Sequence, residues 1–343
     1  MKLLILGGTR FLGRHLVDAA LARGDAVTLF TRGRQPNPWG GAVTALTGDR
    51  DPAKAPGLAA LAQGEWDAVI DTCGYVPRVV RASAELLAPR VGRYLFVSSI
   101  SVFTDASRRG LDESSPVGTL EDPATEEIGK HYGPLKAACE NVVSGIYGER
   151  ALNVRPGLIV GPHDPTDRFG YWAARFCHPA LLGDRPPEAV VPLPAERPIQ
   201  LVDARDLAAF MLGLVARGVG GTFNATSPAG HWTFGDLVRA AGEVAGPGAP
   251  RPAWTDEALL LEKKVAPWTG LPLWIPTTFA DEAGFMEIDC RKAARAGLAV
   301  RPLAATIADT AAWLAQRSDP NAWKDVLGAD AEREILAARG SVH

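Results

Sequence analysis

Residues 5–13 read ILGGTRFLG, and this stretch decides the fold that the rest of the sequence is expected to adopt. Gly7, Gly8 and Gly13 lie between the apolar run MKLLIL at residues 1–6 and a segment with helical periodicity at residues 11–24. Glycines in such a place permit a tight turn, and they let N–H groups at the start of the helix approach a phosphate. A strand-to-helix turn without a ligand carries the same glycines, so the turn alone leaves phosphate binding open.

Short β-branched runs alternate with helical segments through the first half of the chain. We expect strands at residues 2–7, 26–31, 42–48, 67–73, 93–99 and 152–160, and helices at 11–24, 78–90 and 133–148. This alternation predicts a parallel sheet that is covered on both faces. Because crossover connections are right-handed, the predicted fold class is α/β, a doubly wound parallel Rossmann sheet that binds ligands at the carboxyl ends of its strands.

The pattern becomes less regular after about residue 156. We interpret the proline-rich stretches at residues 184–198, 245–254 and 268–278 as loops that interrupt short helices there. We interpret this part as a smaller C-terminal substrate lobe. The expected division is a Rossmann domain at 1–155 plus about 199–226, a substrate lobe at about 156–198 and 227–320, and a C-terminal helical tail at 321–343.

Composition excludes several classes of function. The 343 residues carry a formal net charge of -3, which provides no broad basic field for nucleic acid. No apolar run approaches the length of about 20 residues that crosses a bilayer, and no signal peptide is evident, so we expect a cytoplasmic protein without a membrane partner. The four cysteines form no C-x-x-C pair, and we interpret them as packing residues rather than metal ligands or disulfides.

The end of the second predicted strand bears on the cofactor. An acidic residue there would hold ribose hydroxyls of NAD, but VTLFTRGR at residues 27–34 has Arg32 instead. A guanidinium fork suits a phosphate better than a diol, so Arg32, with Arg10 facing it, is predicted to bind the 2'-phosphate of NADP. NAD remains possible, because the two arginines can also be solvated surface charges. After the third strand, Asp49 is a candidate acceptor for the adenine amino group, or part of an ordinary acidic turn.

A second group of polar residues supplies catalytic chemistry. Ser99 ends a predicted strand, and Tyr132 and Lys136 lie one helical turn apart. A neighbouring ammonium is expected to lower the pKa of a tyrosine hydroxyl, which then acts as general acid or base on a carbonyl or alcohol oxygen. Ser99 bonds the same oxygen in this scheme.

These motifs, with VRPGLIVGPHDPTDRF (154–169) and IQLVDARDLAAF (199–210), resemble the extended short-chain dehydrogenase/reductase family, the NAD-dependent epimerase/dehydratase-like proteins. The resemblance covers most of the chain. It implies a catalytic triad of Ser99, Tyr132 and Lys136, adenine contact from Asp49, and nicotinamide packing near Pro156 and Gly157. The full set of cofactor-binding residues that it implies is Gly7, Gly8, Thr9, Arg10, Phe11, Leu12, Gly13, Arg32, Asp49, Arg50, Thr72, Cys73, Lys136, Pro156 and Gly157, with no metal site.

Departures from the family pattern narrow the function. The Asp-Glu pair that nucleotide-sugar 4,6-dehydratases use to eliminate water is replaced by Ile100 and Ser101. The asparagine and arginine that serve the diphosphate in sugar-nucleotide epimerases are missing, which favours a smaller or less charged substrate unless Arg168 or Arg197 substitutes. Aromatic residues of the second lobe either line an apolar pocket or pack ordinarily; they are Trp172, Phe176, Trp268 and Trp274.

The sequence therefore predicts an NADP-preferring oxidoreductase that transfers hydride between nicotinamide and a carbonyl or alcohol carbon of a small, cyclic or aromatic metabolite. A nucleotide-sugar epimerase with tightly bound NAD(P) is the enzymatic alternative. A non-catalytic RNA-binding or redox-sensing Rossmann protein is the alternative of another class, since proteins with similar GGTR openings include a chloroplast RNA-binding branch. The resemblance also implies a homodimer through residues 78–90 and 133–148.

Overall fold

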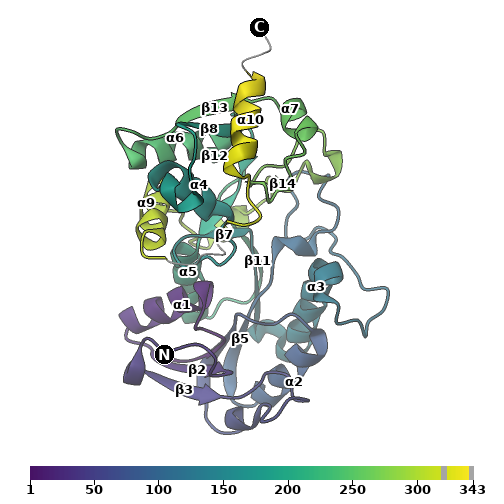
Figure 1. Cartoon of the computed structure of the whole chain (residues 1–343). Helices are drawn as coiled ribbons and strands as arrows, with labels where there is room; N and C mark the ends of the chain where they lie inside the picture. Colours follow the sequence, from purple (N-terminus) through teal and green to yellow (C-terminus); the bar gives the residue numbers. More distant parts are fainter. Residues whose placement is uncertain (318–322, 340–343) are drawn as a thin grey trace.

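A seven-stranded parallel sheet forms the centre of the computed structural model, which describes residues 1–317 and 323–339. Its strand order is β11-β6-β5-β4-β1-β2-β3 (Figure 1). The strands are β1 (Lys2–Leu6), β2 (Ala26–Thr31), β3 (Val43–Thr47), β4 (Trp66–Asp71), β5 (Val91–Val97), β6 (Ala151–Pro156) and β11 (Gly221–Ala225). The strand order reverses between β1 and β4, and in such sheets ligands bind where the loops after these strands separate. The predicted doubly wound α/β sheet is confirmed.

Helices cover both faces of this sheet. On one face α1 (Phe11–Ala22) packs against α5 (Ala204–Ala216), and on the other α2 (Pro77–Leu87) packs against α3 (Ile128–Tyr147). Strand β1 shows why both faces are apolar, since Leu3 and Ile5 enter the first core and Leu4 and Leu6 the second. Side chains alternate between the faces of a strand, so a doubly covered strand needs a continuous apolar run.

Most predicted elements agree with the structure to within about three residues at their ends, and two differ more. The strand expected at 152–160 is two strands, because β6 ends at Pro156 and β7 (Leu158–Val160) leaves the sheet to pair with β10 (Leu201–Asp203). Pro156 is still paired with Ala225 of β11, and the N–H of Gly157 donates to the carbonyl of Ala225 at 3.1 Å before the chain leaves the sheet. The helix expected from residue 133 starts at Ile128 and bends at His131, whose φ and ψ are -121° and 28°.

The second lobe has its own apolar core. Helices α4 (Arg168–Cys177), α6 (Phe234–Ala245) and α9 (Leu303–Leu314) pack together over a parallel pair of strands, β8 (Glu188–Pro192) and β13 (Arg251–Thr255). Both strands lie in stretches that the prolines led us to interpret as loops. That interpretation was wrong, because a two-stranded ladder tolerates proline wherever its missing N–H is not needed. The remaining elements are β9 (Pro198–Ile199), β12 (Trp232–Thr233), α7 (Glu257–Glu262), β14 (Pro267–Trp268), β15 (Leu271–Pro272) and α8 (Arg291–Arg295).

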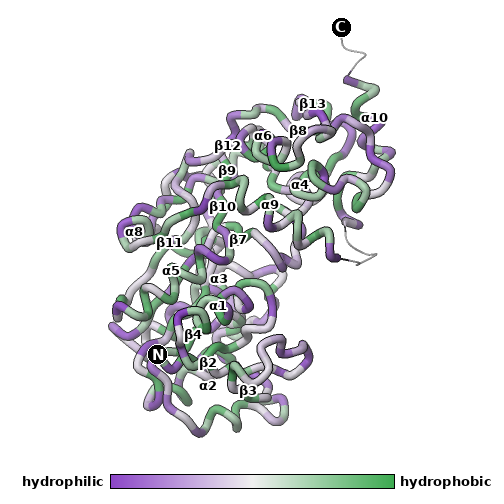
Figure 2. Tube along the Cα trace, turned by 90° about the vertical axis from the view of Figure 1, so that its left-hand side faces the viewer, coloured by the Kyte–Doolittle hydropathy of each residue, from purple (hydrophilic) through white to green (hydrophobic). Residues whose placement is uncertain are grey.

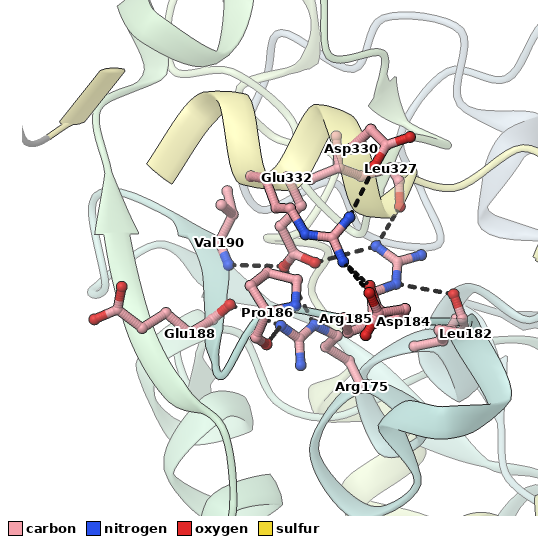
Figure 3. A network of polar contacts seen from close by, with 11 residues as sticks. Arg175, Leu182, Asp184, Arg185, Pro186, Glu188, Val190, Leu327, Asp330 and Glu332 are labelled. Atoms are coloured by element: carbon pink, nitrogen blue, oxygen red, sulfur yellow. Dashed lines mark hydrogen bonds and ion pairs between the residues drawn. The ribbon is translucent and has the colours of Figure 1, made fainter. Parts of the chain in front are cut away.

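Helix α10 (Ala329–Arg339) is attached to this lobe by a buried charge network. The side chains of Glu332 and Arg175 are both 0% exposed, and the Glu332 carboxylate accepts hydrogen bonds from Arg175 Nε at 3.2 Å and Arg185 Nη1 at 3.1 Å (Figure 3). The N–H of Val190 in β8 donates to the same carboxylate at 3.1 Å. Loss of one partner would leave a buried charge without its counter-ion, so the network specifies where α10 docks.

The molecule is elongated, with the sheet at one end and the second lobe at the other (Figure 2). The N-terminus lies at the sheet end and α10 at the far end. The residue limits of the two lobes remain a prediction. The limits placed at 320 and 321 and the end of the predicted tail at 340–343 lie outside the described residues.

Candidate active site

The glycine-rich turn after β1 is sterically closed to side chains. Gly7 and Gly8 have φ values of +100° and +98°, a region that L-residues with a Cβ rarely adopt. A Cβ on Gly7 would overlap Oγ1 of Thr72 at the end of β4, and one on Gly8 would lie 2.8 Å from Leu29 Cδ2. At the start of α1, a Cβ on Gly13 would lie 2.6 Å from the Cα of Gly8. The helix therefore begins directly against the turn, at the point where the strand order reverses.

The start of α1 presents unsatisfied backbone donors. Arg10 is the N-cap residue and makes no side-chain capping hydrogen bond, and the first turn has no acidic residue. The first N–H groups of a helix have no intrahelical acceptor, and the helix dipole adds partial positive charge there. Together with the space that the glycines leave, these donors fit the pyrophosphate of a dinucleotide.

Two exposed arginines flank this turn. Arg32 directly follows β2, and Arg10 precedes α1. Across residues 1–317 and 323–339, neither guanidinium forms an ion pair or a side-chain hydrogen bond. Both are thus available to a ligand, and their contact with a 2'-phosphate stays a prediction.

The residues after β3 point in different directions. Asp49 is half-buried and its Oδ1 accepts a hydrogen bond from the N–H of Asp51 at 2.9 Å. Arg50 instead turns inward and pairs with Asp71 at the end of β4, and its Nη2 also donates to Ser83 Oγ at 3.0 Å. Burial opposes both charges, yet the pairing raises the pKa of Arg50 and lowers the pKa of Asp71. The sequence predicted Arg50 as a cofactor-binding residue. In the structure its guanidinium is buried and is bonded to Asp71 instead.

The loop after β4 connects this ion pair to Lys136, the lysine of the predicted triad. Thr72 Oγ1 donates to the carbonyl of Leu6 at 2.9 Å, and the N–H of Cys73 donates to Asp71 at 3.1 Å. Burial raises the pKa of the Cys73 thiol, so this cysteine is protonated at neutral pH. The carbonyl of Gly74 then accepts a hydrogen bond from Lys136 Nζ at 2.8 Å.

Ser99, Tyr132 and Lys136 come together at the carboxyl end of β5. Ser99 caps the short 3₁₀ helix Ile100–Val102, where its Oγ accepts from the N–H of Ser101 at 3.1 Å. A Cβ on Gly133 would overlap the carbonyl oxygen of Ser101, so α3 packs directly against the segment that carries Ser99. This close approach brings Tyr132 beside Ser99.

Lys136 is the most enclosed member of the group. The residue is 3% exposed. Besides the carbonyl of Gly74, its Nζ donates to the carbonyl of Val97 at 2.6 Å. Its Nζ also lies 4.5 Å from the centre of the Phe96 ring. Burial lowers the pKa of Lys136 to about 8, although the Asp71 carboxylate opposes that shift.

The pKa of Tyr132 differs from the sequence-based expectation. Burial raises it, and a hydrogen bond with Ser99 and the charge of Arg168 only partly offset this effect. The expected lowering by Lys136 is not found, because the lysine ammonium is directed to the carbonyls of Gly74 and Val97. Tyr132 in this state holds its proton at neutral pH.

Tyr75 is a site residue that sequence reasoning missed. Its ring centre lies 6.3 Å from that of Tyr132 and 4.9 Å from Lys136 Nζ, and the residue is 40% exposed. Burial of the hydroxyl raises the pKa of Tyr75 to about 12. Its position just after β4, at the same sheet edge as the glycine turn, was the available signal.

The aromatic residues of the second lobe divide into two groups. Trp172, Phe176 and Trp274 are buried in the lobe core, which is the packing role. Trp268 is half-buried, and the guanidinium carbon of Arg168 lies 5.3 Å from its ring centre. In the part of the chain that the structure describes, no group of three or more His, Cys, Asp or Glu residues is arranged to hold a metal ion. In that same part, no helix is both long enough and apolar enough to span a membrane.

A glycine turn, a Ser-Tyr-Lys group and a strand order that reverses between them define a Rossmann-type site for nicotinamide dinucleotides. The family model of the NAD dependent epimerase/dehydratase family matches residues 3–225, which is more than half of the chain. The protein therefore belongs to this family of enzymes, as the resemblance predicted.

A curated relative is the chloroplast stem-loop binding protein of 41 kDa b from Arabidopsis thaliana, which is 28% identical over 231 residues. The match covers 62% of this chain and 55% of that protein, so the chain spans about half the length of this relative.

Solved structures share the fold at low identity. WbmH of Bordetella bronchiseptica, in complex with NAD+, is 17% identical with a TM-score of 0.66, and the match covers 92% of this chain and 98% of that one. UDP-N-acetylglucosamine 4-epimerase of Methanobrevibacter ruminantium M1, in complex with UDP-N-acetylmuramic acid, is 15% identical with a TM-score of 0.66, covering 92% and 99%. UDP-glucuronic acid 4-epimerase of Bacillus cereus, in complex with NAD, is 15% identical with a TM-score of 0.63, covering 94% and 99%.

Proposed function

We propose that this protein is an NADP-preferring oxidoreductase that transfers hydride between nicotinamide and a carbonyl or alcohol carbon of a small metabolite, cyclic or aromatic in character. The observation that carries the proposal is the position of Tyr132 beside Ser99, one helical turn from the buried Lys136. Family membership supports the redox class, and the two free arginines at the glycine turn support the phosphorylated cofactor.

The cofactor would be held along the edge of the sheet. Backbone N–H groups at the start of α1 suit the pyrophosphate, Asp49 the adenine, and Arg10 with Arg32 the 2'-phosphate. Pro156 and Gly157, at the end of β6, would face the nicotinamide side. When bound, the nicotinamide supplies or accepts the hydride.

The chain's own residues handle the proton. Tyr132, protonated at neutral pH, donates its hydroxyl proton to a carbonyl oxygen as that oxygen gains charge, and Ser99 donates a hydrogen bond to the same oxygen. Lys136 has three N–H donors, of which two are used by the carbonyls of Gly74 and Val97. The third remains for a ribose hydroxyl of the cofactor. Lys136 would therefore bind and orient the cofactor rather than lower the pKa of Tyr132.

Fluorescence titration and turnover test this function together. The purified protein should enhance NADPH fluorescence on binding, and NADPH absorbance should fall when a panel of cyclic and aromatic ketones and aldehydes is supplied. Binding of neither NADPH nor NADH would contradict the proposal. Tight binding of UDP- or dTDP-sugars with no net consumption of cofactor would favour the epimerase alternative instead.

A second candidate function comes from the curated relative, which is a stem-loop binding protein. We propose it as an alternative in which the Rossmann domain serves RNA binding. Filter binding of a stem-loop RNA, at several salt concentrations and without cofactor, tests it. Tight and salt-sensitive binding would support it, although the net charge of -3 argues against a broad phosphate-binding surface.

A further inference from the structure

Arg168 begins α4 in the second lobe, and its charge acts on the hydroxyl of Tyr132 in the candidate site. It follows Asp167, which adopts left-handed backbone angles (φ 56°), and its Nε donates to Thr166 Oγ1 at 3.2 Å. Its guanidinium carbon lies 5.3 Å from the centre of the Trp268 ring. Stacking on an aromatic ring fixes the plane of a guanidinium and leaves its edge for a planar partner.

Trp268 is itself held in place. The residue has a φ of +65°, which is strained for a tryptophan, and its ring packs edge-on against Phe285 with the centres 5.4 Å apart. Its backbone N–H donates to the carbonyl of Trp274 at 2.8 Å. Such strain persists only where the surroundings impose it, and here the result is a rigid surface for Arg168.

Arg168 has no direct ion-pair partner among the residues that the structure describes. The side chain is half-buried and burial lowers its pKa, which shows that its hydration is reduced. Within residues 1–317 and 323–339 it forms no ion pair with any carboxylate. Asp164 lies within electrostatic reach and partly offsets the effect of burial on Arg168, but it makes no direct ion pair with the guanidinium. Its Oδ1 accepts from the N–H and hydroxyl of Thr166, its buried Oδ2 has no hydrogen-bond partner, and burial raises the pKa of Asp164.

Arg197, the other arginine that the sequence offered for substrate binding, contrasts with this. It is ion-paired with Glu257, and it also donates to the carbonyls of Ile275 and Leu193. These bonds, made by its two terminal nitrogens, hold the guanidinium of Arg197 inside the lobe. Arg168 is therefore the cation of this pair that remains available, and its charge reaches the hydroxyl of Tyr132.

We propose that Arg168, held on Trp268, binds an oxyanion of the substrate, a carboxylate or a phosphate, while Tyr132 contacts the reacting oxygen. A half-buried cation without a direct ion-pair partner is stabilised when a ligand supplies the anion. The inference rests on the proposed function and adds the substrate class to it, since neutral carbonyl compounds would leave Arg168 unpaired.

The test uses the NADPH-loaded protein, so that the glycine turn is already occupied, and isothermal titration calorimetry. Three probes separate the ligand classes. Phenylpyruvate carries a carboxylate, phenylacetone replaces that carboxylate by a methyl group, and UDP-glucose carries a diphosphate. We expect at least one anionic probe to bind more tightly than phenylacetone, and Arg168→Gln to weaken it on the order of 10- to 100-fold. Loss with phenylpyruvate identifies a carboxylate as the ligand of Arg168, and loss with UDP-glucose identifies a phosphate. The second result, without net consumption of cofactor, supports the role of Arg168 but favours the epimerase alternative over the proposed reductase.

Variants control for folding and for net charge. Arg239→Gln removes the same charge from an exposed position on α6 in the same lobe and should leave probe affinity unchanged. Arg168→Lys, which keeps the charge but loses the planar fork, should give an intermediate affinity. Trp268→Phe should weaken binding of the anionic probe less than Arg168→Gln does. Retained NADPH binding by each variant shows that the fold is intact.

The two failures can be told apart. If the wild type binds NADPH but neither anion, or if Arg168→Gln binds the anions as the wild type does, this inference is overturned and the proposed function stands. If the wild type takes up no nicotinamide nucleotide, the proposed function fails and the inference fails with it.

Discussion

Arg50 and Asp71 form a doubly hydrogen-bonded ion pair inside the protein, directly below the loop that holds Lys136. The Asp71 carboxylate also accepts from the hydroxyl of Tyr94 at 2.8 Å and from the N–H of Cys73 at 3.1 Å. The pair thus connects the loop after β3 to β4 and β5. Because both charges are buried, each depends on the other for its stability.

We predict that Arg50→Met lowers the free energy of unfolding by about 3–5 kcal/mol, since it leaves the Asp71 carboxylate buried and unpaired. Urea denaturation measures the change. Arg78→Met is the matched control, because Arg78 pairs with Asp51 and Glu126 at the surface, where solvent screens the charges and such pairs contribute little. Equal effects of the two substitutions would show that the Arg50–Asp71 pair stabilises no more than a surface pair does.

The contrast between Arg50 and Gly7 shows which parts of the site were predictable. Glycine spacing, the alternation of strands with helices and the Tyr132–Lys136 interval are local patterns, and the fold that they predicted is confirmed. The inward direction of Arg50 depends on Asp71, a partner 21 residues away, so only the tertiary structure reveals it. The contact between Trp268 and Arg168 could not be predicted for the same reason, because the two residues lie far apart in the sequence. The prolines prevented β8 and β13 from being predicted as strands. A short ladder accepts proline at positions where a helix does not.

Gly133 is predicted to be indispensable for the site. In Gly133→Ala the new Cβ overlaps the carbonyl oxygen of Ser101, so α3 must move away from the segment that carries Ser99. We expect a loss of about 1–3 kcal/mol in stability and a fall in turnover that exceeds any loss of cofactor affinity. Gly145→Ala in the same helix meets nothing within 4 Å and should be neutral or stabilising. Unchanged turnover in Gly133→Ala would contradict the close packing described for Tyr132 and Ser99.

Cofactor choice is predicted to depend on Arg32. If this guanidinium and that of Arg10 bind a 2'-phosphate, NADPH should bind on the order of 10-fold or more tightly than NADH. Arg32→Ala should remove that preference by weakening NADPH alone. Arg34→Ala, two residues further along the exposed loop, serves as control and should keep the preference. Equal affinity of the wild type for both nucleotides would refute the assignment.

The pKa of Lys136 predicts how cofactor affinity depends on pH. The pKa is about 8, below the ordinary value of 10.5, so the ammonium is present below about pH 8 and is lost as the pH rises through that value. Cofactor affinity should therefore fall between pH 7 and 9.5, because the neutral amine binds the ribose hydroxyl less strongly. Titrations of Lys136→Met should show weak affinity without this pH dependence, whereas Tyr132→Phe should retain it. A flat profile in the wild type would mean that Lys136 does not titrate in this range.

The division of labour within the triad gives the last prediction. Tyr132→Phe keeps the ring and its packing but removes the proposed proton donor, so folding and NADPH binding should persist while turnover falls by on the order of 10² to 10⁴. Ser99→Ala should mainly lower turnover, since Ser99 is proposed to bond the reacting oxygen of the substrate and no part of the cofactor, whereas Lys136→Met should impair binding and turnover together. The rates are followed as loss of NADPH absorbance with a ketone or aldehyde that the wild type reduces. If Tyr132→Phe reduces that compound at the wild-type rate, Tyr132 is not the proton donor, and its place on α3 beside Ser99 has only a packing role.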